Sequence, residues 1–170
     1  MMKKKFLLPI LIIIVCIIVY FIWSQPSGDT VESREQILNN EIEKGNDWTI
    51  SKEIVIEGYI ISGAYSADDK STLAIFEPIS NNKYKFVTST NRDNDKIIIS
   101  GFTINGDWYD LIWFNGAQTQ YAEVIYTLDG QMHDTLKYDT TDMDIIYNKN
   151  PAKEYTMKVC YYDDKGNKYE

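Results

Sequence analysis

The sequence predicts a mainly β protein: an antiparallel β-sandwich of immunoglobulin-like or related topology, preceded by one transmembrane helix and one short amphipathic helix. Three observations predict it. Residues 6–23 carry no charge, residues 29–44 have the pattern of a capped helix, and short aromatic and β-branched runs alternate with turn residues from Trp48 onward. We therefore expect four regions: a cytoplasmic tail at 1–5, a transmembrane helix at 6–23, a linker and short helix at 24–46, and a β-domain at 47–170.

The uncharged run directly follows Lys3, Lys4 and Lys5. At a rise of about 1.5 Å per residue it would be about 27 Å long as a helix, close to the thickness of a bilayer core. Lysines before such a run favour a cytoplasmic N-terminus, which would place the rest of the chain outside the cell membrane. No A-x-A cleavage pattern follows Trp23, so we expect a retained single-pass signal-anchor, with a cleaved secretory signal as the alternative.

The part beyond residue 23 keeps 14 of the 17 basic residues and all 25 acidic ones, a net charge of −11. Nucleic acid and anionic lipid are poor partners for such a surface, since binding phosphate needs clusters of Lys and Arg. Only Cys160 lies beyond the uncharged run, so an internal disulfide cannot form there. An exported domain without a disulfide framework fits a bacterial cell envelope.

A short amphipathic helix is expected from Asp29 to about Lys44. Asp29 and Glu32 have the spacing of a capping box, and Gly45 would end the helix. Its apolar stripe is thin, which predicts packing along one edge or a stalk between the bilayer and the domain.

Strands are expected wherever alternating runs lie between turn residues: 52–61, 71–77, 84–90, 96–103, 108–115, 121–128, 132–138, 143–147 and 155–162. The dipeptides between them, among them Asn105-Gly106 and Asp129-Gly130, favour hairpins between consecutive strands. The sheet is therefore predicted to be antiparallel. A partly closed barrel is the second alternative, and a curved sheet around one helix, cystatin-like in outline, is the third.

Aromatic and carboxylate side chains are most concentrated in the runs 108–115 and 121–128. If they pair as a hairpin with Asn115 opposite Tyr121, two faces follow. One face is a predicted core and places Asp110 opposite Tyr126, whose phenol could donate to the carboxylate. Its members are Trp108, Asp110, Ile112 and Phe114 with Ala122, Val124, Tyr126 and Leu128.

The other face of this hairpin predicts an aromatic binding platform made of Tyr109, Trp113, Tyr121 and Glu123. Aromatic rings beside a polar group suit sugar rings or an apolar patch of a partner. The alternative is that the helix or neighbouring residues cover this face.

Catalytic and metal sites are not indicated. Asp110 and Glu123 face opposite ways in this register, which disfavours a two-carboxylate glycosidase. His133 is the only histidine, and the sequence has no G-x-S-x-G elbow that could supply the serine of a catalytic triad. We therefore expect His133 to be a solvated hairpin residue. The run 91–96 resembles the start of a calcium loop but has Lys96 where glycine is needed. No catalytic residue, metal or cofactor is therefore predicted.

These motifs do not indicate a family with a known activity. The runs 121–130 and 161–170 resemble hairpins of Gram-positive envelope proteins, and the resemblance implies no functional position. The expected function is a non-enzymatic binding, sensing or assembly module of a bacterial cell envelope, partnered by the membrane and by an envelope protein or cell-wall glycan. A glycan-binding domain using the aromatic face is the first alternative. A hydrolase whose acidic residues converge only in three dimensions is the second.

Overall fold

The computed structural model describes residues 11–17, 26–42, 47–80, 82–93, 97–114, 120–140, 144–150 and 154–169. Within them, a helical segment at 11–17 and helix α2 precede eleven strands. Their bounds are α2 (Val31–Glu41), β1 (Thr49–Ile56), β2 (Tyr59–Tyr65), β3 (Lys70–Ser80), β4 (Lys83–Asp93), β5 (Ile97–Ile104), β6 (Asp107–Phe114), β7 (Tyr121–Leu128), β8 (Gln131–Asp139), β9 (Ile145–Asn150), β10 (Thr156–Tyr162) and β11 (Lys168–Tyr169).

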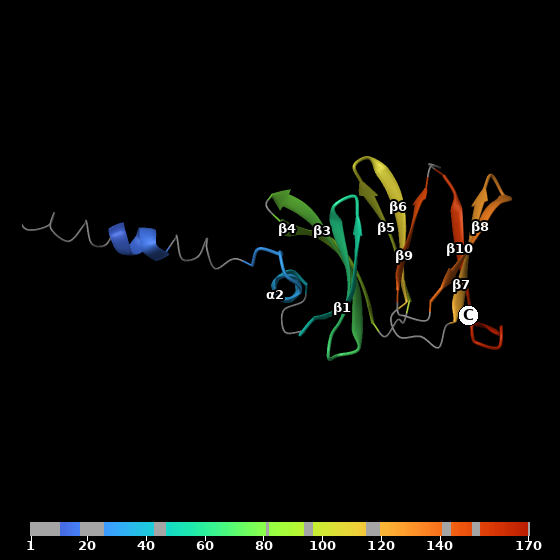
Figure 1. Ribbon diagram of the computed structural model, residues 1–170, viewed down its shortest axis with the longest axis horizontal. Helices are drawn as coiled ribbons and strands as arrows, with labels where there is room; N and C mark the ends of the chain where they lie inside the picture. The colour runs from blue at the N-terminus through green and yellow to red at the C-terminus, as the bar shows by residue number, and fades with distance from the viewer. Residues whose placement is uncertain are drawn as a thin grey trace, which may run out of the picture.

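The described strands form three antiparallel sheets that are stacked face to face (Figure 1). The first sheet has the order β1-β2-β3-β4, the middle sheet β5-β6-β9, and the last sheet β11-β10-β7-β8. The prediction of a mainly β, antiparallel protein is confirmed. The described strands form three stacked sheets, one more than an immunoglobulin domain has, and the middle sheet is covered on both faces.

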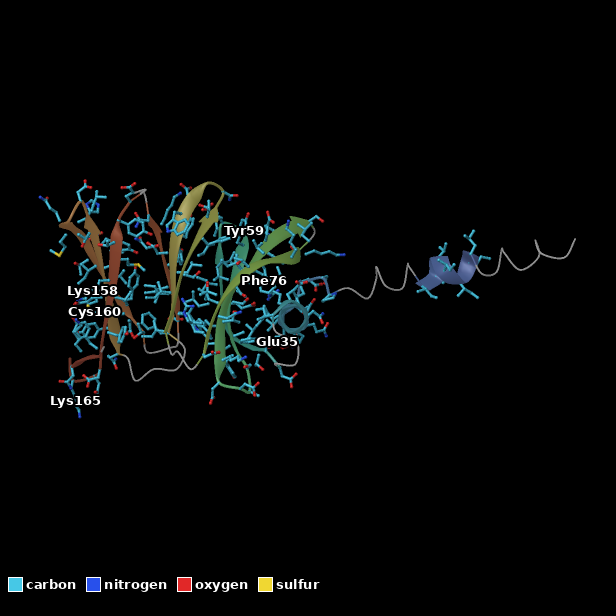
Figure 2. The ribbon with its side chains drawn as sticks, turned by 180° about the vertical axis from the view of Figure 1, so that it is seen from behind. Glu35, Tyr59, Phe76, Lys158, Cys160 and Lys165 are labelled. Atoms are coloured by element: carbon cyan, nitrogen blue, oxygen red, sulfur yellow. The ribbon has the colours of Figure 1, made fainter. Side chains whose placement is uncertain are left out.

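Each pair of neighbouring layers encloses its own hydrophobic core. Helix α2 packs on the outer face of the first sheet through Ile37 and Leu38, with Phe76 beneath them. The first and middle sheets enclose Leu73 and Trp113 with their neighbours. The middle and last sheets enclose a third cluster, which comprises Ile112, Phe114, Ala122, Val124 and Tyr126. Figure 2 shows the resulting order of layers, with Glu35 on the helix at one end and Cys160 on β10 at the other.

Hairpins join consecutive strands where the turn dipeptides predict them. Asn105 and Gly106 have φ of 51° and 92°, and Asp129 and Gly130 have similar values, as type I′ turns require. The expected single strand at 52–61 is wrong: it contains the turn between β1 and β2. Glu57 has φ of 49° there, and only Gly58 after it marked the turn in the sequence, because glutamate is not a usual turn residue.

Helix α2 begins one residue later than predicted. Thr30, and not Asp29, is the N-cap, and its hydroxyl accepts a 3.2 Å hydrogen bond from the backbone N–H of Ser33. The helix ends at Glu41, so it is shorter than the predicted span to Lys44. Lys44 and Gly45, the predicted end signals, lie outside the described residues.

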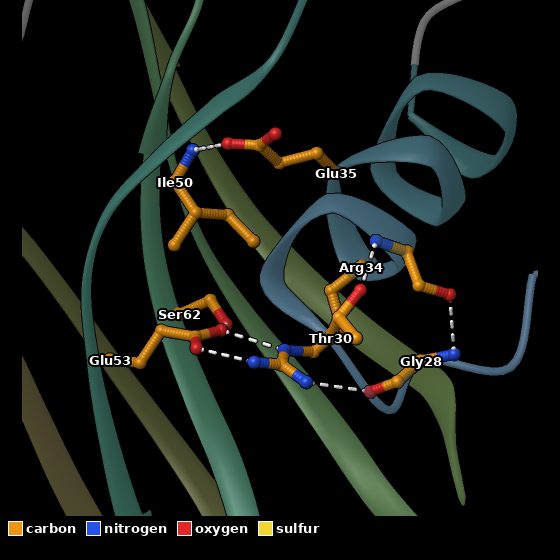
Figure 3. A network of polar contacts seen from close by, with 8 residues as sticks. Gly28, Thr30, Arg34, Glu35, Ile50, Glu53 and Ser62 are labelled. Atoms are coloured by element: carbon orange, nitrogen blue, oxygen red, sulfur yellow. Dashed lines mark hydrogen bonds and ion pairs between the residues drawn. The ribbon is translucent and has the colours of Figure 1, made fainter.

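One largely buried ion pair fixes α2 to the first sheet (Figure 3). Arg34 binds both carboxylate oxygens of Glu53 on β1, at 2.8 and 2.5 Å, and donates to the carbonyl of Gly28 at 2.6 Å. The hydroxyl of Ser62 on β2 also donates to Glu53, at 2.6 Å. The bidentate geometry satisfies both charges, which makes this a paired rather than an isolated buried charge. The helix is therefore fixed to the sheet and does not act as a separate stalk.

The predicted transmembrane helix falls largely outside the described residues, at 6–10 and 18–23. Residues 11–17, in the middle of that run, are helical. Among the described residues, no helix has both the length and the apolar character needed to cross a membrane. The anchor and the four-region division of the chain stay predictions.

Candidate functional site

The predicted hairpin between β6 and β7 is wrong. Strand β6 pairs with β5 and β9, whereas β7 pairs with β8 and β10. The physical reason is that β6 is apolar on both faces, so it is stable only at the centre of a covered sheet. After Phe114 the chain leaves the middle sheet, and it enters the last sheet at Tyr121.

The predicted core face is present, but its two strands belong to different sheets. Ile112 and Phe114 of β6 pack against Ala122, Val124 and Tyr126 of β7, as expected from the sequence. The two strands meet across the space between the middle and last sheets, however, and do not lie side by side in one sheet. Side-chain alternation identified the face correctly, although the pairing was wrong.

The four residues of the predicted platform are divided between two places. Tyr109 and Trp113 are 3% and 1% exposed, in the core between the first and middle sheets. The Trp113 ring lies directly against Gly63 of β2, where an added Cβ would be 2.4 Å from Cε2. Tyr121 and Glu123 instead lie on the last sheet. These four residues therefore do not form the predicted exposed aromatic platform.

Tyr121 and Glu123 belong to a compact cluster on the solvent side of the last sheet. The ring of Tyr121 stacks on Tyr162 with 4.6 Å between centroids, and Nζ of Lys137 lies 3.7 Å from its centroid. Because β8 and β10 flank β7 on opposite sides, Lys137 and Tyr162 cover opposite ring faces. The hydroxyl of Tyr162 donates to Glu123 at 3.0 Å, and this bond raises the pKa of Tyr162. The groups in this cluster that could contact a ligand are thus already engaged with one another.

The interface between the middle and last sheets becomes polar at one end, around Asp110. This carboxylate is only 4% exposed. It accepts hydrogen bonds from Nε1 of Trp108 at 3.0 Å, from Nδ2 of Asn150 at 3.3 Å, and from the hydroxyl of Tyr155. All three donors are neutral groups, so a buried negative charge is held by hydrogen bonds from three segments of the chain.

The tyrosines beside Asp110 are held in their neutral form. Burial raises the pKa of Tyr155 to about 12, and its hydrogen bond to Asp110 and the charge of that carboxylate add to the effect. Burial also raises the pKa of Tyr126, again with a contribution from Asp110. The predicted proximity of Asp110 and Tyr126 is therefore confirmed, across two sheets.

A pocket of about 150 Å³ opens beside these tyrosines, between β7, β8 and β9. Its walls carry phenol, hydroxyl, amide, imidazole, carboxylate and ammonium groups. The lining residues are Tyr126, Thr127, Leu128, His133, Asp134, Asn148, Lys149, Asn150 and Tyr155. His133 is exposed on β8, as predicted, but it also lines this pocket.

The sequence reasoning missed the contributions of Asn148, Asn150 and Tyr155. Asn148 and Asn150 alternate along β9, and they pair with Asp110 and Trp108 of β6 in the register of the middle sheet. Their spacing was the available signal, but the predicted strand ended at residue 147. Without the pairing of β9 with β6, nothing local connects them to Asp110.

Metal ligation is not supported where the chain is described: those residues contain no group of three or more His, Cys, Asp or Glu able to hold an ion. Residues Asn91 to Asp93, the start of the calcium-like run, belong to strand β4. The remainder of that run, 94–96, lies outside the described residues. Cys160 is buried, as a packed strand residue would be.

Comparison of the chain with protein-family models, with curated proteins and with solved structures finds no match.

Proposed function

We propose that this chain is a single-pass membrane protein of a bacterial cell envelope, whose β-domain lies outside the membrane as a non-enzymatic binding module. The anchor is supported by the uncharged run at 6–23 behind Lys3, Lys4 and Lys5. It is also supported by the helical segment at 11–17, where Leu11, Ile12 and Ile13 are each more than half exposed. Apolar side chains on such a helix are stable in lipid and costly in water.

The binding role is carried by one observation, the polar pocket next to Asp110. Neutral hydrogen-bonding groups dominate it, and they converge from the middle and last sheets on one small concave space. Asp134 is the only carboxylate among the residues that line it, and the hydroxyl groups there belong to Thr127, Tyr126 and Tyr155. A single lining carboxylate does not supply the pair of carboxylates that most glycoside hydrolases use, which favours recognition of a ligand over that reaction.

The test is the topology of the full chain in cells. An epitope tag is placed after Glu170, and protoplasts are treated with a protease that cannot enter them. We expect the protein in the membrane fraction and the tag removed without lysis. The matched control replaces Ile13 and Ile14 with aspartate, which should release the protein from the membrane. A tag that is protected until the cells are lysed would contradict the proposal.

A further inference from the structure

We propose that the polar end of the middle–last sheet interface binds a glycan chain, with one sugar ring stacked on Trp108 and a neighbouring ring in the pocket lined by Asn148 and Asn150. This inference rests on the proposed function and names the ligand class of its pocket. It is built from residues other than the four that the sequence predicted.

Trp108 is the exposed indole of the described domain. It is 42% exposed, whereas Trp48 and Trp113 are 3% and 1% exposed. The ring lies over Gly101 of β5, where an added Cβ would be 2.1 Å from Cζ2. Part of the indole is thus placed against the backbone of the middle sheet, Nε1 points to Asp110, and part of the ring is open to solvent. A partly exposed aromatic ring held in one orientation is a group on which the C–H faces of sugars can stack.

The orientation of this indole is fixed before any ligand arrives. Its Nε1 donates to Asp110, which is itself held by Tyr155 and Asn150. A ring that is already fixed loses little conformational entropy on binding. The carboxylate therefore acts as a positioning residue for the stacking surface.

The indole lies next to the pocket, because two residues connect them. Trp108 pairs with Asn150 in the register of β6 and β9, and Asn150 lines the pocket. Tyr155 connects them, because its hydroxyl binds Asp110 and its side chain also lines the pocket. Trp108 leans toward β5 and the pocket lies beside β9, so the surface is longer than a single ring. Such a shape suits a chain of sugars.

The size and chemistry of the pocket favour a sugar. At about 150 Å³ it is smaller than the roughly 300–1,000 Å³ of pockets for drug-sized ligands, so it suits one ring of a longer molecule. The amides of Asn148 and Asn150 each contain donor and acceptor atoms, as sugar hydroxyls require, and Nδ2 of Asn150 also donates to Asp110. Lys149, the cation of the lining, is paired with Asp107. A polyanion is therefore disfavoured by Asp110, by Asp134 and by the charge of −11 beyond residue 23.

The position of the site fits a wall ligand. The chain enters the domain at α2, and the site lies beyond the first sheet, between the second and third layers (Figure 1). With stacked sheets about 10 Å apart, this places the site tens of ångströms from the entry point of the chain. Wall glycan is the polymer that an outward-facing site at this distance would meet.

The experiment uses the purified full chain in a polyoxyethylene detergent, which carries no sugar. The probe is chitotetraose, a soluble chain of four N-acetylglucosamine rings. We expect saturable binding by calorimetry, together with protection of tryptophan emission from acrylamide quenching. Trp108→Ala should weaken binding at least about tenfold, whereas Trp108→Phe, which keeps an aromatic ring, should weaken it less.

The matched control is Tyr65→Ala, which removes an aromatic side chain that is 49% exposed on the first sheet and should bind chitotetraose like the unaltered chain. Unaltered circular dichroism of Trp108→Ala would establish that it folds. Equal affinity of Trp108→Ala and the unaltered chain would overturn the proposal, as would the absence of both binding and quenching protection.

A second arm separates glycan from protein ligands. The full chain is sedimented with isolated cell-wall fragments before and after protease treatment of the walls. Retained sedimentation supports a glycan, and its loss after protease would overturn the proposal in favour of a protein partner. Neither arm depends on the topology of the chain in cells, so failure here leaves the protoplast result standing, and the converse also holds.

Discussion

Nε1 of Trp108 donates a 3.0 Å hydrogen bond to Oδ1 of Asp110, two residues further along the same strand. Residues at this spacing share a face of the sheet, so the indole and the carboxylate both point toward the last sheet. There Asp110 also accepts a hydrogen bond from the hydroxyl of Tyr155, which precedes β10. The interface between the two sheets is thus apolar at the Phe114 end. At its other end, hydrogen bonds to the Asp110 carboxylate hold the two sheets together.

Replacing Asp110 with asparagine should lower the free energy of unfolding by about 1–3 kcal/mol. The amide keeps the size of the side chain but turns two N–H donors toward groups that are themselves donors. Urea unfolding followed by tryptophan fluorescence measures the loss. Asp134→Asn is the matched control, because Asp134 is exposed, and it should change the stability by less than about 0.5 kcal/mol. Equal effects of the two substitutions would contradict the role of Asp110.

Alkaline pH should destabilise the domain through Tyr155. Its pKa is raised to about 12 in the folded chain, against about 10 when unfolded. Because the folded pKa is the higher one, the stabilisation is fully present below about pH 10 and is lost as the pH rises toward 12. Titration of phenolate absorbance tests this: Tyr155→Phe should remove ionisation near pH 12 and leave the titration near pH 10 unchanged. If Tyr155→Phe instead reduces the phenolate absorbance that develops near pH 10, the pKa of Tyr155 is not raised.

Arg34→Leu should destabilise the chain by about 3–5 kcal/mol, because it leaves the Glu53 carboxylate without its bidentate partner. The double variant with Glu53→Leu should cost less than Arg34→Leu alone, since it removes both charges. Thermal or urea unfolding of the two single variants and the double variant measures this coupling. If the two single losses simply add, the ion pair does not attach α2 to the first sheet.

Gly63→Ala should cost about 1–3 kcal/mol, because its Cβ would be 2.4 Å from Cε2 of Trp113. Trp113→Phe should also destabilise, by leaving a cavity. In the double variant the smaller ring makes room for the new methyl group, so the combined loss should be smaller than the sum of the two. A double-mutant cycle in urea gives the coupling, and a value of zero would place Trp113 elsewhere.

Local patterns in the sequence predicted the parts of the fold that depend on neighbouring residues. Asn105-Gly106 and Asp129-Gly130 identified two hairpins, and side-chain alternation placed Ile112 and Phe114 on a core face. The pairings β6–β9 and β7–β10 join strands that are distant in the sequence, and no turn or spacing signals them. The assumption that β6 continues into β7 as a hairpin therefore produced the wrong platform.

The candidate site was predictable only in part, for the same reason. Asp110 and Tyr126 were expected to lie close together and do so, because both belong to the face between two layers. Trp108 was expected in the core, yet it is exposed, since it lies at the end of β6, where the apolar packing stops. The buried position of Trp113 depends on the first sheet, whose packing against β6 no local pattern in β6 could reveal.

Hydrogen–deuterium exchange of the full chain, with and without isolated cell-wall fragments, tests most directly that the polar end of the middle–last sheet interface is the binding site. We predict slower exchange of backbone amides in three segments when the fragments are bound: 107–110, 148–150 and 154–156. Residues 121–123 and 160–162, which carry the Tyr121–Tyr162 cluster, should exchange at unchanged rates. Protection of that cluster without protection at 148–150 would contradict this assignment of the binding site.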